Sequence, residues 1–324
     1  QTLQNDDSIS VGGQAVIEGV MMRSPVAVAT AVRKSDGSIS INHFLYKSLT
    51  KRKKFWGLPV IRGAVSLVEA LYLGIKTLNW SAEEASEEEE TKKKSRLRDT
   101  LLSALSIIIA LAGGLALFML LPYWVTGLIR DAGGSQFIFH AAAGLIRIIL
   151  FLLYLLVISR WKEIARVFQY HGAEHKSIFA FEREGEVSVE SAKRYSRFHP
   201  RCGTSFLLIT AIIVIFLFAV IDSIIVPVFG EYRSPLHRLL AHLPFIPLVA
   251  GVAYEILKLS GKKQEQGIWR HLIKPGLWLQ HITTNEPDEK QLEVAAAALK
   301  ASLRTDEAEA DSANLTAVEV MEGD

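Results

Sequence analysis

Five side chains that can bind a metal ion or transfer a proton lie in the middle of the chain: His171, Glu174, His175, His199 and Cys202. The first three form the pattern His-x-x-Glu-His, which in inverted zincins supplies two zinc ligands and a general base. On a helix, His171 and His175 lie one turn apart, so both imidazoles face one side and can share an ion. His199 and Cys202 are separated by two residues, a workable spacing for a nitrogen and a sulfur ligand.

These residue types predict a metal site, with zinc as the default ion because nitrogen and sulfur ligands are mixed. The candidate ligands are His171, His175, His199 and Cys202, and Glu174 is the candidate catalytic base. A zincin takes its third ligand from a downstream glutamate, and Glu255 qualifies only if its helix brings it to the histidines. In the alternative interpretation, the histidines pack on an apolar helix face and Cys202 is a small buried apolar residue.

A glycine-rich segment near the N-terminus, VGGQAVIEGVMMRSP at 11–25, contains a second candidate catalytic residue, Glu18. The segment lacks the Gly-Lys-Ser/Thr end of a phosphate-binding loop, so nucleotide binding is disfavoured. Two arrangements remain open for Glu18. It either pairs with Arg23, or it faces the histidine-bearing region and supports the ligands or orients a substrate.

Four apolar stretches flank these residues and predict transmembrane helices, at 101–122, 137–158, 204–226 and 236–258. Each holds about 20 mostly apolar residues, the length that crosses a hydrocarbon core of ~30 Å. Asp222, late in the third stretch, is expected at the membrane interface. The alternative, buried helices of a large soluble protein, is disfavoured by the length of the stretches. The predicted fold is mainly α: a polytopic membrane protein with four transmembrane helices and a small N-terminal α+β cytoplasmic unit.

Basic residues in the loops predict the orientation of these helices. The loop 159–203 contains nine lysines and arginines, whereas the connections 123–136 and 227–235 contain one each. Because short loops rich in Lys and Arg stay in the cytoplasm, we expect both termini and the histidine-bearing loop on that side. The net charge of +2 is explained by this topology and indicates no nucleic-acid partner, so the lipid bilayer is the expected partner. One cysteine excludes an internal disulfide.

The chain is predicted to divide into seven parts: 1–80, an N-terminal cytoplasmic unit; 81–100, a charged linker; 101–158, transmembrane helices 1 and 2; 159–203, the cytoplasmic His/Cys loop; 204–258, transmembrane helices 3 and 4; 259–304, cytoplasmic interfacial and amphipathic helices; and 305–324, an acidic disordered tail. In the first part, two strands are expected around a turn at Ser35–Ser38, since Asp-Gly accepts positive φ values. Residues 57–80 predict a helix on the membrane or against the spans, with a re-entrant segment as the alternative.

Within the His/Cys loop, apolar residues spaced three and four apart predict one helix from about 161 to Gly185. No helix-breaking residue separates it from the second span, so a continuous helix is expected. Such a helix would carry His171 about 20 Å beyond the bilayer, at 1.5 Å per residue. Because Cys202 lies beside the third span, the loop must fold back before these ligands can meet. A second short helix is expected over SVESAKRYSRF, ending at Pro200.

The chain resembles the YqhQ-like family in four segments: GGQAVIEGVMMR at 12–23, YHGAEHKSIFAFE at 170–182, HPRCGTSF at 199–206 and PGLWLQHITTNEPDEKQLEVA at 275–295. The resemblance extends over about residues 10–300. The family comprises bacterial membrane proteins, with relatives in chloroplasts, and is commonly described as predicted metal-dependent enzymes of unassigned function. The resemblance implies a bacterial plasma-membrane location and a role for His171, Glu174, His175, His199 and Cys202.

Two functions follow from these patterns. The first is a metal-dependent, hydrolase-like enzyme whose site faces the cytoplasm. The second is a non-catalytic scaffold or assembly factor for membrane proteins or lipids, in which the same residues hold the cytoplasmic part together. Four protein ligands around the metal would favour the scaffold, and an open fourth position would favour the enzyme.

Overall fold

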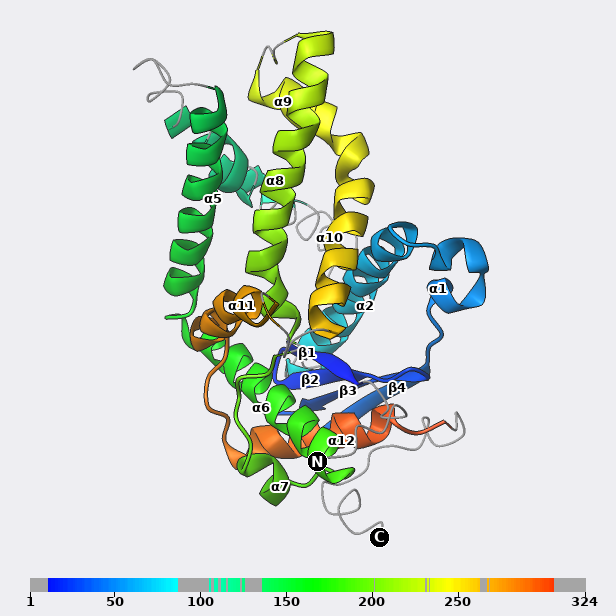
Figure 1. The fold of residues 1–324 in the computed structure, drawn as a ribbon. Helices are drawn as coiled ribbons and strands as arrows, with labels where there is room; N and C mark the ends of the chain where they lie inside the picture. The colour runs from blue at the N-terminus through cyan, green and yellow to red at the C-terminus, as the bar shows by residue number, and fades with distance from the viewer. Residues whose placement is uncertain are drawn as a thin grey trace.

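The computed structural model describes three parts of the chain: 11–86, isolated positions between 105 and 125, and 136–305 apart from 201, 231, 233, 263–266 and 268. The expected first span at 101–122 is described only in part, and most of the expected linker and nearly all of the acidic tail lie outside the described residues. The described chain is mainly helical. Figure 1 shows long helices standing above a unit that contains a single sheet.

The sheet has four antiparallel strands in the order β1-β2-β3-β4: Gly12–Val16, Gly19–Arg23, Ala27–Arg33 and Ile39–Leu45. The expected turn joins β3 to β4, and Gly37 adopts a φ of 89° there. The glycine-rich segment, which the sequence left without a secondary structure, forms β1 and β2 and doubles the size of the expected hairpin.

Both faces of the sheet are covered by helices, because successive side chains of a strand point to opposite faces. One face, with Val20 and Met22, packs against α6 (Lys162–Glu184) and α12 (Glu289–Ser302). The other face, with Met21 and Val28, packs against Leu73 of α2 (Ile61–Ala85). The sheet therefore separates α6 from α2, and these two helices carry different sites.

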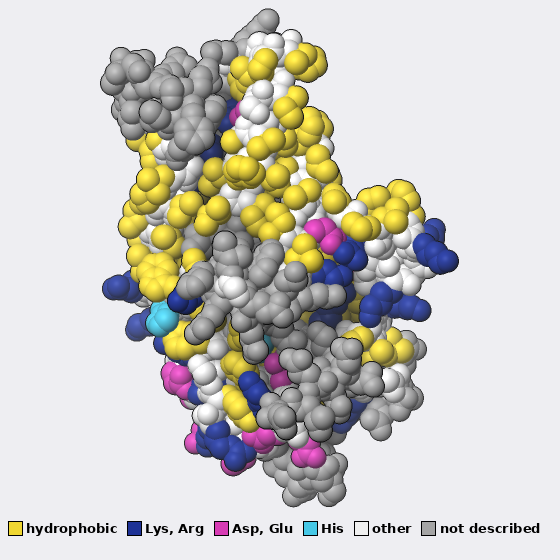
Figure 2. Space-filling model, viewed as in Figure 1, with side chains coloured by type: hydrophobic (Ala, Val, Ile, Leu, Met, Phe, Trp, Pro, Cys, Tyr) yellow, Lys and Arg dark blue, Asp and Glu magenta, His cyan; other side chains and the backbone are white. Residues whose placement is uncertain are grey.

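Two helical segments are long and apolar enough to cross a membrane: Thr210–Phe229 in α8 (Gly203–Phe229), and Leu236–Ile256 across α9 (Pro235–His242), η3 (Leu243–Phe245) and α10 (Ile246–Lys262). A third candidate is a bent pair formed by α6 and α5 (Gln136–Ile158). Figure 2 shows hydrophobic side chains covering these upper helices, whereas charged side chains gather around the lower unit. The described residues thus contain two or three candidate spans.

The expected continuous helix through 159–162 is wrong. The chain bends by 99° between Ile158 and Lys162, and Trp161 has an extended backbone. No proline or glycine causes this break. The apolar sequence of α5 ends here, and α6 instead packs along the sheet, so tertiary contacts override the local helical preference. The bend keeps His171 close to the end of the spans and removes the expected 20 Å separation.

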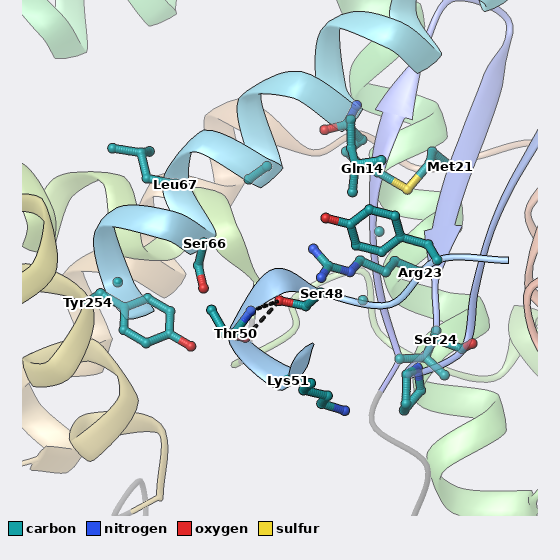
Figure 3. Close-up of a pocket in the computed structure, with 18 of the residues that line it drawn as sticks. Gln14, Met21, Arg23, Ser24, Ser48, Thr50, Lys51, Ser66, Leu67 and Tyr254 are labelled. Atoms are coloured by element: carbon teal, nitrogen blue, oxygen red, sulfur yellow. Dashed lines mark hydrogen bonds between the residues drawn. The ribbon is translucent and has the colours of Figure 1, made fainter. Parts of the chain in front are cut away.

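The remaining described elements are short or C-terminal: α1 (Leu49–Arg52), η1 (Lys54–Gly57), η2 (Ala116–Leu120), α7 (Val189–Lys193) and α11 (Trp269–Thr283). As expected, α6 ends just before Gly185, whose φ is 81°. Helix α2 packs against α10 where Gly63 meets Gly251. Between α2, α10 and the sheet lies a cavity of about 830 Å³ (Figure 3).

Candidate metal centre

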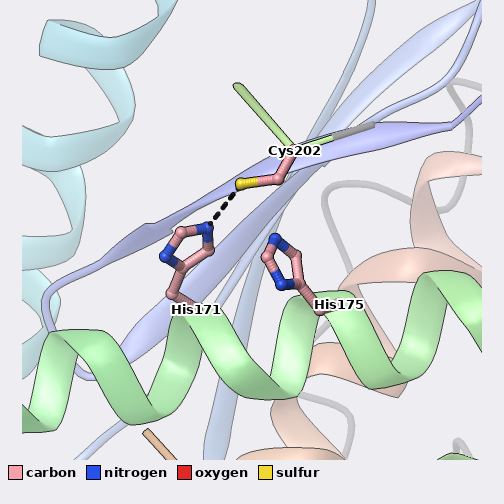
Figure 4. A group of neighbouring side chains, drawn as sticks. All are labelled: His171, His175 and Cys202. Carbon is pink, nitrogen blue, oxygen red and sulfur yellow. Dashed lines mark hydrogen bonds between the residues drawn. The ribbon is translucent and has the colours of Figure 1, made fainter. Parts of the chain in front are cut away.

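Three of the predicted ligands meet in one buried group. Helix α6 presents His171 and His175 on one face, and Cys202 immediately precedes α8 (Figure 4). One potential ligand atom from each residue lies within 4.8 Å of the others. The closest measured pair is His171 Nε2 and Cys202 Sγ, at 3.2 Å. The bend before α6 makes this possible, because it turns the helix back beneath the start of α8.

Backbone carbonyl groups fix both imidazoles. His171 Nδ1 lies 2.8 Å from the carbonyl oxygen of Thr283, and His175 Nδ1 contacts the carbonyl oxygen of Arg197. Because a carbonyl only accepts hydrogen bonds, each Nδ1 carries the proton and each Nε2 is unprotonated, that of His171 facing the Cys202 sulfur. Metal-binding histidines are commonly oriented in this way by a partner on the other ring nitrogen.

His175 is the most informative member of the group. Its Nε2 is buried and faces the Cys202 thiol, which also lies against His171 Nε2, so a single thiol proton faces two ring nitrogens. Burial also lowers the pKa of His175, which keeps the ring neutral and able to donate a lone pair. A buried polar atom without a partner costs about 1–3 kcal/mol, so a native structure is expected to satisfy it in some way.

The donor set fits a metal ion. Across a tetrahedral zinc with bonds of about 2.05 Å to nitrogen and about 2.3 Å to sulfur, ligand atoms are about 3.5 Å apart. The separation of 3.2 Å between His171 Nε2 and Cys202 Sγ is close to that value. Two neutral imidazoles and one thiolate therefore form a donor set that suits zinc, with all three ligand atoms within 4.8 Å of one another.

Glu174 lies next to this group but is not part of it. One of its carboxylate oxygens is 3.9 Å from His171 Nε2, and the backbone amide of Gly13 donates a hydrogen bond to the carboxylate. A Cβ atom at Gly13 would lie 3.1 Å from Glu174 Oε1 and 2.4 Å from the Met21 carbonyl oxygen, so only glycine lets β1 come this close. Burial raises the pKa of Glu174, and neighbouring His171 and His199 oppose this effect.

His199 is adjacent to the three ligands without joining them. Its ring centroid lies 5.7 Å from that of His175, and its Nε2 lies 3.4 Å from a carboxylate oxygen of Glu182. The Gln280 side chain holds the His199 backbone, accepting from its amide at 2.8 Å and donating to its carbonyl at 2.7 Å. Burial lowers the pKa of His199 to about 4. A rotation of the side chain would be needed for it to become a fourth ligand.

The two remaining candidates lie elsewhere. Glu18 occupies the tight turn between β1 and β2 with a φ of 50°, and it pairs with Arg166 and accepts from the Tyr170 hydroxyl at 3.3 Å. Of the two arrangements left open, it thus faces α6 and does not pair with Arg23. Glu255 pairs with Arg62 of α2 and is not part of the histidine group, whose third candidate ligand is Cys202.

Sequence reasoning missed the groups that orient the ligands. The acceptors at Thr283 and Arg197 are backbone carbonyls, which every residue carries and no residue type reveals. Gln280 and Gly13 are likewise supporting groups whose roles depend on contacts between distant segments. The only available signal was indirect, since Gln280 and Thr283 lie inside one of the four segments that carried the family resemblance.

Comparisons with known proteins give a consistent result. Residues 58–305 match a family described as "Protein of unknown function (DUF1385)". The chain is 36% identical over 302 residues to "Uncharacterized protein YqhQ" of Bacillus subtilis (strain 168), covering 90% of this chain and 92% of that protein. No solved structure matches the chain.

Proposed function

We propose that this chain, which belongs to the DUF1385 family, is a metal-binding membrane protein in which His171, His175 and Cys202 hold one zinc ion. The observation that supports the proposal most strongly is His175 Nε2, a buried lone pair that shares the single Cys202 thiol with His171 Nε2. A bound ion would satisfy it.

We further propose that the site acts as a hydrolase-like catalyst. When bound, zinc lowers the pKa of a water molecule and polarises a carbonyl or phosphoryl oxygen. Three protein ligands leave one tetrahedral position open, as in catalytic zinc sites. Glu174, whose carboxylate lies 3.9 Å from His171 Nε2, would act as the proton acceptor for that water, and this proximity supports the assignment. Glu18, paired with Arg166, holds the N-terminal half of α6 against the sheet and is not assigned a chemical role.

The proposed location is a bacterial plasma membrane, with four spans and both termini in the cytoplasm. The nine basic residues of the loop 159–203 support this orientation, as does the position of the buried group at the start of α8. A cysteine in place of Phe229, exposed at the far end of α8, should react with a membrane-impermeant thiol reagent in intact cells. A cysteine in place of Glu190 should not react, and labelling at Glu190 in intact cells would overturn the orientation.

A structural function is the second candidate, and the burial of the group favours it. His171, Glu174, His175 and Cys202 are each less than 10% exposed. The group joins α6, the segment before α8 and the end of α11, so an ion there would also fix the cytoplasmic unit. In this scaffold reading, His199 would rotate in as the fourth ligand and Glu174 would have no chemical role.

Metal analysis of the purified protein tests the shared premise of both candidates. Protein purified in detergent without chelator should contain about one zinc per chain. His175→Ala and Cys202→Ser should each lose most of it, since removing one ligand forfeits the shared geometry. His281→Ala, an exposed histidine on α11, is the matched control and should retain the ion. Wild-type protein without a stoichiometric transition metal would refute the proposal.

A further inference from the structure

The cavity between the sheet and the apolar helices has two chemically different halves. Its volume is about 830 Å³, and it is lined by β1, β2, the segment before α2, and parts of α2, α8 and α10. Figure 3 shows Arg23 and Ser48 on one side and Leu67 and Tyr254 on the other. It lies on the α2 side of the sheet, across β1 from the group formed by His171, His175 and Cys202.

The polar half presents cations and hydroxyl groups. The Arg23 guanidinium lies 4.9 Å from the centre of the Tyr46 ring and 3.6 Å from a carboxylate oxygen of Glu69. Glu69 is buried, and it is held by the Ser48 hydroxyl at 2.8 Å and the Leu49 amide at 2.6 Å. This arrangement fixes Arg23 with its charge directed into the cavity, and Lys51 supplies a second cation at the rim.

The apolar half continues onto a surface suited to lipid chains. Leu67 of α2 and Ala250 and Ala253 of α10 line this wall. Helix α2 also exposes a row of large apolar side chains. Two of them, Leu71 and Ile75, are 57% and 60% exposed. A charged group in the polar half could therefore be attached to hydrocarbon chains that leave the cavity along α2.

A basic and aromatic segment leads away from the cavity at Lys51. Four consecutive exposed cations, Lys51 to Lys54, run through α1 and into η1, and the exposed Phe55 and Trp56 follow directly. Basic clusters beside membrane spans attract anionic lipids, and tryptophan prefers the level of the lipid headgroups. The charge of this segment, which begins at the cavity with Lys51, therefore complements an anionic headgroup at the membrane surface.

We propose that this cavity binds the phosphate-bearing headgroup of an anionic membrane lipid, with Arg23 and Lys51 contacting the phosphate and the acyl chains lying along α2 and α10. The site is separate from the metal centre, because the backbone of Gly13 in β1 lies between the cavity and Glu174. The proposal does not depend on the proposed zinc chemistry.

Lipid titration of the purified full-length chain tests this site. Short-chain phosphatidylglycerol, phosphatidylcholine with the same acyl chains, and inorganic phosphate are added separately in neutral detergent, and adducts are counted by native mass spectrometry. Phosphatidylglycerol should bind at least tenfold more tightly than either of the other two ligands. Equal binding of the two lipids would overturn the charge recognition, and equal binding of inorganic phosphate would overturn the assignment to a lipid.

Two variants place the binding in the cavity. Arg23→Gln combined with Lys51→Gln should weaken phosphatidylglycerol binding about tenfold and phosphatidylcholine binding less, so that the preference for the anionic lipid is lost. Lys51→Gln alone changes only an exposed side chain, so the fold should stay intact. This variant should bind phosphatidylglycerol several-fold more weakly than the wild type, a smaller loss than in the double variant. Lys290→Gln, an exposed lysine of α12 across the sheet, should bind as the wild type does. Unchanged binding by both cavity variants would overturn the proposal, and zinc content measured in the same samples should stay constant.

Discussion

Two buried polar clusters lie at opposite ends of α8, and their hydrogen bonding differs. Near its start, His171, His175 and Cys202 converge, and one thiol proton faces two ring nitrogens. Near its far end, Asp222 accepts from Arg238, from Tyr232 at 2.7 Å and from His242 at 2.6 Å. The second cluster satisfies its carboxylate completely and needs no ligand. The contrast indicates that a buried histidine points to a ligand-binding site only where its hydrogen-bonding atoms are not all satisfied by the protein.

The largest expected effect comes from Glu174→Gln, which tests whether the first cluster is catalytic. The amide is nearly isosteric and can still accept from the Gly13 amide, so zinc content, folding and membrane insertion should be unchanged. Because the amide cannot take up a proton, activity should fall about 10²–10⁴-fold. The measurement is complementation of a deletion strain, with zinc analysis of the same variant.

A fully complementing Glu174→Gln variant would remove the reason for assigning a catalytic role. The scaffold function would then be the better account, and both clusters would be structural. His175→Ala serves as the reference for complete loss, because it should abolish zinc binding and complementation together.

Asp222→Ala should produce the next largest effect, on stability alone. It leaves Arg238, which is only 7% exposed, without its carboxylate. Removing one member of a buried ion pair costs about 3–5 kcal/mol, so the thermal unfolding midpoint in detergent should fall clearly. Zinc content of the folded fraction should remain that of the wild type. Glu186→Ala, an exposed acid, is the control; loss of zinc in Asp222→Ala would mean that the two clusters are coupled.

The sequence predicted the histidine pair, their shared helix face and the end of α6 at Gly185, because all three depend on local spacing. It did not predict the bend at 159–161, since no residue there breaks a helix and the cause is packing on the sheet. Asp222 was expected at the interface, yet its partners come from α9 and the connection before it. Contacts between distant segments decide both features, and a single sequence does not reveal them.

Gly13→Ala should have the smallest effect and should sharpen the description of the first cluster. The added methyl group would lie 2.4 Å from the Met21 carbonyl oxygen, so β1 must shift, at a cost of about 1–3 kcal/mol. Gly12→Ala is the matched control, because no atom lies within 4 Å of its added Cβ. The thermal unfolding midpoints of the two variants, compared with each other, measure the loss of stability caused by the displacement of β1. Equal midpoints would show that the close approach of β1 is not required.

The hydrogen bond between His171 and Thr283 also constrains the order in which the molecule can be completed during synthesis. Thr283 lies 112 positions after His171, and both candidate spans of α8, α9 and α10 are made between them. The ribosome therefore delivers the histidines and Cys202 well before the carbonyl group that fixes the His171 ring. A chain that stops short of α11, or whose last spans fail to insert, has the ligands but lacks the acceptor that orients one of them. The His171 ring can therefore be fixed only after α8, α9 and α10 have been synthesised and α11 has reached its position.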